Sequence, residues 1–115
     1  MGDQAAPNVP VVVALPAEID VTNSQEVYQQ LVAALAPGVS TVIADMMSTV
    51  FCDSSGVHAI MHAYESAAAR DVRMLLAVSS ATSVRRVLEL IGVGRLMPVY
   101  SSLAEALTAS TKDEA

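Results

Sequence analysis

The sequence has little cysteine and few aromatic side chains. Its single cysteine, Cys52, excludes an internal disulfide and a thiolate zinc cluster, which fits a reducing compartment. Tryptophan is absent and only 3 Tyr and 1 Phe occur, whereas 36 of the hydrophobic residues are Ala or Val. A core built from such small side chains requires helices that pack close to whatever they cover.

Basic side chains and long apolar runs are also scarce. Six Lys and Arg stand against 12 Asp and Glu, the sequence pI is about 4.6, and Arg85-Arg86 is the longest basic tract. Direct nucleic-acid binding is excluded because it needs a basic face, whereas an acidic surface suits a basic protein partner. No run reaches the roughly 18 apolar residues of a membrane span, and the N-terminus lacks the basic segment of a secretory signal. We therefore expect a cytoplasmic protein without membrane insertion.

Strand and helix signals alternate along the 115 residues. Short β-branched runs predict strands at residues 11–15, 39–45, 72–78 and 96–100, with a helical pattern after each of them. This order predicts one α/β domain with a small, mostly parallel sheet flanked by four helices. We expect the domain at residues 9–110, a flexible N-terminus or edge strand at 1–8, and a polar tail at 111–115.

Several residues predict where the helices begin and end. Asn23 with Glu26, and Ser102 with Glu105, have the spacing of capping boxes. Gly92 is expected to end the third helix. Residues 46–52 are expected to form a connector, in which Met46 and Met47 could contact a partner, whereas Met61 and Met74 are expected to fill the core.

Acidic and hydroxyl side chains follow the predicted strands. In a parallel sheet the carboxyl ends of the strands share one edge. That edge is expected to collect the following residues: Asp20, Asp45, Asp53, Ser54, Ser79 and Ser101. Ser54 opens a helix, where backbone N–H groups can bind an anion, although Asp and Ser are also ordinary caps.

Residues 45–57, with the sequence DMMSTVFCDSSGV, resemble the signature of the STAS-domain anti-sigma factor antagonists of bacteria. Residues 18–20 are similar to the acidic motif of that family's first loop, and residues 84–93 are similar to its third-helix segment. The resemblance extends over about residues 11–107 and implies a STAS-like fold.

The resemblance implies a phosphorylation switch in stress-response transcription. It implies that an anti-sigma factor, which is also a serine kinase and holds the ATP, phosphorylates Ser54. Unphosphorylated, the protein binds that kinase and releases a sigma factor, and a serine phosphatase restores this form. The partner-binding residues implied are Asp20, Asp53, Ser55 and Gly56, and His58 is expected to join them because it would project near the same interface. The protein itself is then not an enzyme and needs no cofactor.

Electrostatics is consistent with this switch. A phosphate on Ser54 adds about −1.5 to −2 charges, which the helix N-terminus could accommodate. Asp20 and Asp53 would add to the negative potential and repel a partner matched to the neutral hydroxyl. The partner surface could include Arg85 or Arg86 on the next helix.

Some positions depart from the family pattern and leave alternatives open. His58 stands where a small residue is frequent, so it could tune which kinase is accepted. His58, His62 and Glu65 could share a helix face, but a His-Glu-x-x-His motif is absent and no metal site is expected. A hydrolase based on Ser54 and His58 lacks a residue that orients the imidazole. The other reading is a non-catalytic STAS scaffold module in a larger stress-signalling assembly.

Overall fold

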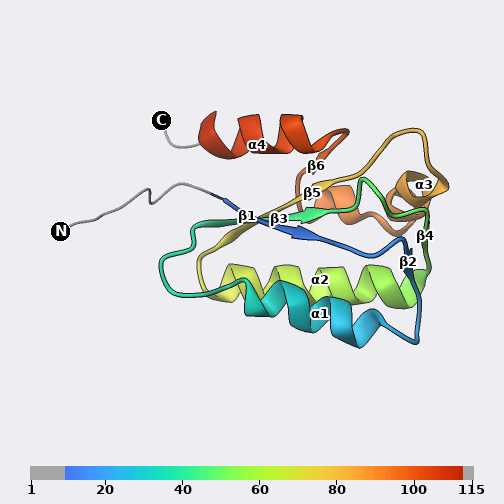
Figure 1. The fold of residues 1–115 in the computed structure, drawn as a ribbon, viewed down its shortest axis with the longest axis horizontal. Coiled ribbons are helices and arrows are strands. Elements are labelled where there is room, and N and C mark those ends of the chain that lie inside the picture. The colour runs from blue at the N-terminus through green and yellow to red at the C-terminus, as the bar shows by residue number, and fades with distance from the viewer. Residues whose placement is uncertain (1–9, 113–115) are drawn as a thin grey trace.

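The computed structural model describes residues 10–112 and shows a layered α/β fold. The main sheet contains β1 (Val11–Ala14), β3 (Thr41–Asp45), β5 (Arg73–Ala77) and β6 (Val99–Tyr100), in the order β1-β3-β5-β6. All three strand pairs in this sheet are parallel, which confirms the predicted fold class. Helices α1 (Ser24–Ala33) and α2 (Ser54–Ala69) cover one face, and α4 (Leu103–Lys112) covers the other (Figure 1).

A second, smaller sheet was not expected from the sequence. Strand β2 (Glu18–Ile19) pairs in parallel with β4 (Phe51–Cys52), in a segment predicted to be loop and connector. Strands of two residues are too short to show the alternation by which a strand is recognised. This small sheet lies at the end of the molecule where α2 begins, next to α3 (Ser83–Ile91) (Figure 1).

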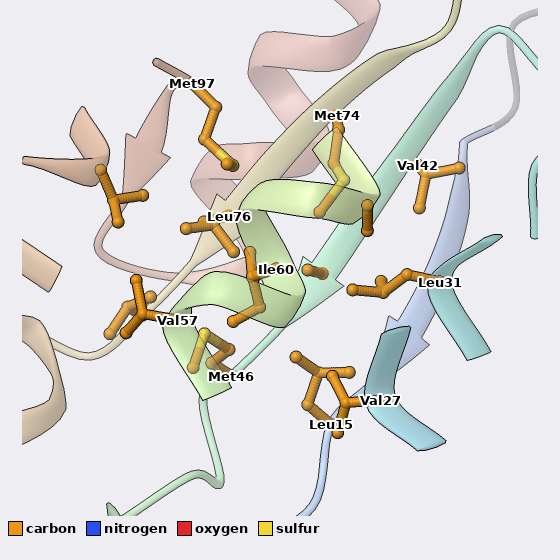
Figure 2. Close-up of a cluster of buried hydrophobic side chains, with 14 of the residues drawn as sticks. Leu15, Val27, Leu31, Val42, Met46, Val57, Ile60, Met74, Leu76 and Met97 are labelled. Carbon is orange, nitrogen blue, oxygen red and sulfur yellow. The ribbon is translucent and has the colours of Figure 1, made fainter. Parts of the chain in front are cut away.

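The main core lies between the sheet and helices α1 and α2. Val27 and Leu31 of α1 and Val57 and Ile60 of α2 meet side chains of the sheet in one cluster (Figure 2). Met46 belongs to this cluster and is fully buried, so the expectation that it contacts a partner is wrong. It directly follows β3, and its backbone N–H donates to Ala77 O, which carries the side chain into the core.

The opposite face of the main sheet is covered by helix α4 (Figure 1). Ile43, Leu75 and Ala77 of the sheet pack against Ala106 of α4, and Met47 lies at the edge of this cluster. The helix contributes the small side chain of Ala106 to this contact, whereas the sheet contributes the larger side chains of Ile43 and Leu75. None of the helices within residues 10–112 combines the length and apolar character needed to cross a membrane.

The predicted helix ends are confirmed in part. Ser102 Oγ accepts from Glu105 N at 3.0 Å, as a capping box requires, while the Glu105 carboxylate accepts from Ser101 N, one residue before the cap. Gly92 ends α3 with a left-handed φ of 89°, which glycine adopts without strain. Asn23, however, makes no side-chain cap on α1, because its side chain bonds the backbone of the preceding loop.

The C-terminal third differs from the prediction in two places. Residues 93–95 form a short 3-10 helix, so β6 begins only at Val99 and not at residue 96. Helix α4 continues to Lys112, two residues into the expected polar tail. The expected flexible segment or edge strand at residues 1–8 lies outside the described residues.

Candidate functional site

The small sheet brings two distant acidic residues to the same place. Because β2 pairs with β4 in parallel, Asp20 and Asp53 each leave their strand at the same end. Asp53 N donates to Ile19 O at 3.1 Å, which extends the ladder by one residue and fixes the two positions side by side. The predicted proximity of Asp20 and Asp53 follows from this small sheet and not from the edge of the main one.

Asp53 is the N-cap of α2. Its Oδ1 atom accepts from Ser55 N at 3.0 Å and from Gly56 N at 3.2 Å. Ser55 Oγ donates to the same oxygen at 2.6 Å. These bonds, first the one from the Ser55 hydroxyl and then the one from the Gly56 amide, lower the pKa of the Asp53 carboxyl, because each favours its charged form. Two amides at the start of α2 are therefore already occupied by a carboxylate.

The two adjacent serines have different surroundings. Ser55 is half-buried and its hydroxyl is bonded to Asp53. Ser54 is the first residue of α2, is exposed, and forms no hydrogen bond through its hydroxyl to another described residue. Of the two, only Ser54 presents a hydroxyl that is both exposed and without a hydrogen bond to another described residue.

Gly56 is buried where α2 meets the small sheet. A Cβ at this position would lie 2.6 Å from Ile19 Cγ2 and 2.7 Å from Cys52 Sγ, both too close for any side chain. The absence of a side chain therefore lets the first turn of α2 rest directly on β2 and β4. Gly56, expected as a partner-binding residue, is placed under the site and not on its surface.

Cys52 is buried under the same turn. Only 3% of the residue is exposed, and burial together with the charge of Asp53 raises the pKa of its thiol to about 11. A thiol that stays protonated at neutral pH is a poor nucleophile. Cys52 is therefore a packing residue, as its lack of a basic neighbour in the sequence predicts.

The loop that carries Asp20 is held by its own polar groups. Asp20 Oδ1 accepts from Thr22 N at 2.9 Å, and Asp20 N donates to Asn23 Oδ1 at 2.9 Å. Asn23 Nδ2 also donates to Glu18 O at 2.8 Å. These bonds give the acidic loop one conformation and keep Asp20 half-buried at the site.

Three exposed apolar side chains lie near Asp20 and Asp53, and they were not predicted from the sequence. Val21 follows Asp20, while Val50 and Phe51 precede Cys52, and their exposed fractions are 75%, 60% and 49%. Because Glu18 pairs with Phe51 across the small sheet, acidic and apolar side chains are neighbours there. The signal was two successive apolar residues, Val50 and Phe51, inside a segment predicted to be a connector. We call Glu18, Asp20, Val21, Val50 and Phe51 the acidic–apolar surface.

His58 lies on the exposed side of α2, four residues after Ser54. With His62 and Tyr28 it lines an open groove of about 610 Å³ between α1 and α2. The Tyr28 and Ser66 hydroxyls lie 3.4 Å apart in the wall of this groove. Among residues 10–112 no three His, Cys, Asp or Glu side chains are placed to hold a metal ion.

Other residues expected at this edge have local roles. Asp45 Oδ1 accepts from Met47 N, and Ser79 Oγ accepts from Ala81 N. Arg85 is half-buried, and its Nη1 donates to Val78 O at 3.1 Å and contacts Ser101 Oγ at 3.4 Å. Arg85 therefore ties α3 to the ends of β5 and β6, whereas its neighbour Arg86 is exposed.

Comparison with solved structures finds the same fold elsewhere. An anti-sigma factor antagonist from Mycobacterium paratuberculosis is 23% identical, with a TM-score of 0.79 over 95% of this chain and 90% of that one. SpoIIAA, an anti-sigma factor antagonist, in its unphosphorylated form is 25% identical, with a TM-score of 0.72 over 95% and 94%. A sulfate transporter family protein from Wolinella succinogenes is 17% identical, with a TM-score of 0.67 over 97% and 93%.

The sequence itself is also informative about the family. No protein of curated function matches it. The model of the STAS domain family, however, matches residues 3–106, which include both sheets and the first residues of α4. The chain therefore belongs to the STAS domain family and resembles its anti-sigma factor antagonists.

Proposed function

We propose that this protein is an anti-sigma factor antagonist that works by partner switching. Unphosphorylated at Ser54, it binds an anti-sigma factor that is a serine kinase, and a sigma factor is released. Phosphorylation of Ser54 ends this binding, and a serine phosphatase restores it. The observation that carries the proposal is the exposed, unbonded hydroxyl of Ser54 beside a neighbour whose hydroxyl is engaged by Asp53. The protein is not a catalyst, and the exchange takes place in the cytoplasm.

The mechanism follows from the occupied cap of α2. A phosphate on Ser54 cannot use the amides of Ser55 and Gly56 without displacing the Asp53 carboxylate. It therefore stays on the surface and adds about −1.5 to −2 charges next to Asp53 and Asp20. Because Ser54 is exposed, this charge acts on the partner and leaves the fold intact.

The acidic–apolar surface supports a partner of defined chemistry. The side chains of Phe51, Val50 and Val21 expose apolar area to water, and a partner that covers this area would bury it favourably. Glu18 and Asp20 lie among them, so the complementary surface is apolar with basic groups at its edge. Phosphorylation would set a new negative charge close to this surface without removing any of its apolar contacts.

The first experiment identifies the acceptor. The protein is incubated with candidate anti-sigma serine kinases and ATP, and the modified residue is mapped by mass spectrometry. We expect one phosphate on Ser54, none in S54A, and normal labelling of S55A, which keeps Ser54. Labelling at another residue, or none with any kinase tested while the protein stays stably assembled with other proteins, would favour the scaffold role.

The second experiment tests the switch by binding. S54A is expected to bind the kinase like the unmodified protein, and S54D is expected to bind at least about tenfold more weakly because of its charge. F51S is expected to weaken binding by a similar factor, since Phe51 is the largest exposed apolar side chain of the surface. V12S, a matched change at an exposed valine of the edge strand β1, is expected to bind normally. Equal affinities of S54A and S54D would refute the switch.

A further inference from the structure

His58 stands four residues after Ser54 on α2, a spacing at which its side chain can reach the turn that carries Ser54. Residues four apart on a helix are neighbours, about 5–6 Å between their Cβ atoms. Side chains of a helix also tilt toward its N-terminus, so a residue covers the turn before its own. Both residues are exposed, and within residues 10–112 neither side chain has a hydrogen-bond or ionic partner.

The surroundings of His58 contain no competing anion on its own level of the helix. Across the groove α1 contributes Ser24, Gln25 and Tyr28, which carry no charge at neutral pH. Along α2 the other charged or titratable groups are Asp53 at the cap, His62 one turn further on, Glu65 nearly two turns further on, and Tyr64, which packs against the core. In the stretch from Asp53 to Met61, His58 is the one side chain that can become a cation.

We propose that His58 positions the phosphate of phosphorylated Ser54 by pairing its imidazole with the phosphate oxygens. This inference rests on the proposed phosphorylation of Ser54. Two of the amides that can donate to a phosphate at a helix start, those of Ser55 and Gly56, already donate to Asp53, so a neighbouring side chain is an additional donor. The imidazolium donates one N–H to the phosphate, which is held against α2 and stays doubly charged at lower pH than an isolated phosphoserine. The phosphate thereby keeps its second negative charge to slightly lower pH, while the imidazolium offsets part of that charge at the surface.

The test uses protein with phosphoserine incorporated at position 54 during translation, so that no kinase is needed. The ³¹P NMR signal is followed against pH in the wild-type background, in H58Q and in H62Q. We expect the titration midpoint of the phosphate to lie about 0.3 pH units lower in wild type than in H58Q, the size of an exposed i, i+4 ion pair. H62Q, which changes an exposed histidine two turns from Ser54, is expected to match wild type, and concentrated salt is expected to reduce the difference.

Two outcomes would overturn the pairing. Equal midpoints in wild type and H58Q would show that the imidazole does not contact the phosphate. A shift in H62Q as large as that in H58Q would show only a general effect of helix charge. Neither outcome bears on partner switching, which S54A and S54D test without any phosphate. Failure of the switch would likewise leave the midpoint difference unchanged.

Discussion

The two sheets of this molecule share parallel pairing but differ in what they bury. In β3 and β5 every residue except Asp45 and Arg73 is buried, and helices cover both faces. In β2 and β4 one residue of each strand, Ile19 or Cys52, is buried, and the other is exposed. The main sheet therefore holds the fold together, while the small sheet positions the start of α2 and presents a surface.

The largest effect is expected in the main core. Ile60 is fully buried between α2 and the sheet (Figure 2), so I60A should lower the free energy of unfolding by about 3 kcal/mol through lost burial and a cavity. V50A, in the small sheet's exposed surface, should change it by less than about 0.5 kcal/mol. Urea denaturation followed by circular dichroism measures both. Similar losses in the two variants would mean that Val50 belongs to the core, against its 60% exposure.

The chemical protection of Cys52 measures how tightly the small sheet is closed. With the pKa of its thiol raised to about 11, the thiolate is scarce, and at about pH 8 the folded protein should react with a disulfide reagent about 100-fold more slowly than an ordinary thiol. Burial slows it further. The same protein unfolded in urea provides the control and should react at the normal rate. Equal rates in both states would show that β4 opens readily.

Gly56 tests the contact between the small sheet and α2. In G56A the new methyl group would meet Ile19 and Cys52 at less than 3 Å, so stability should fall by about 2 kcal/mol and Cys52 should react faster. G94A is the matched control, since a Cβ there meets nothing within 4 Å and its φ is not positive. Unfolding and thiol-labelling measurements on both variants separate the two sites. A neutral G56A would mean that the two layers can move apart at no cost.

The same contrast explains which parts of the fold can be predicted from sequence. Strands β1, β3 and β5 of the main sheet lie in continuous apolar runs and the helices between them carry apolar faces, so the apolar pattern identifies them, whereas the two-residue β6 was predicted to be longer. The small sheet has two residues per strand and exists because Gly56 lets α2 rest on it. Its pairing is therefore a consequence of tertiary packing, which local patterns do not contain.

The site shows a similar limit. The Asp-Ser-Ser-Gly tetrad identifies the region, and its resemblance to a known family singles out Ser54. The sequence cannot show that Ser55 is bonded to Asp53 or that Gly56 lies underneath, because both depend on the angle at which α2 leaves β4. Asn23 is another example. Asn is a favoured N-cap residue, but the side chain of Asn23 forms its hydrogen bonds with the backbone of Asp20 and Glu18 and not with α1.

The smallest effect is the pH dependence that Asp53 contributes. Its carboxyl has a lowered pKa in the folded protein because of the Ser55 hydroxyl and the backbone amides, whereas the ordinary value is 3.8. Unfolding therefore raises its proton affinity, so the stabilisation is present above about pH 4 and is lost as the pH falls through the folded value. D53N keeps a capping oxygen without the charge, and its Tm should be on the order of 1–2 °C below wild type at neutral pH and equal to it in acid.

The Ser55 hydroxyl supplies the control for this effect. The bond from the Ser55 hydroxyl is the largest cause of the lowered pKa of Asp53. S55A should therefore reduce the pH-dependent part of the difference in Tm between proteins with Asp and with Asn at position 53. Thermal unfolding of wild type, D53N, S55A and the double variant between acid and neutral pH measures this coupling. Additive effects would show that the two side chains act independently. A coupled result would mean that Ser55 serves the cap, which leaves Ser54 as the hydroxyl of the pair that can be modified without loss of the fold.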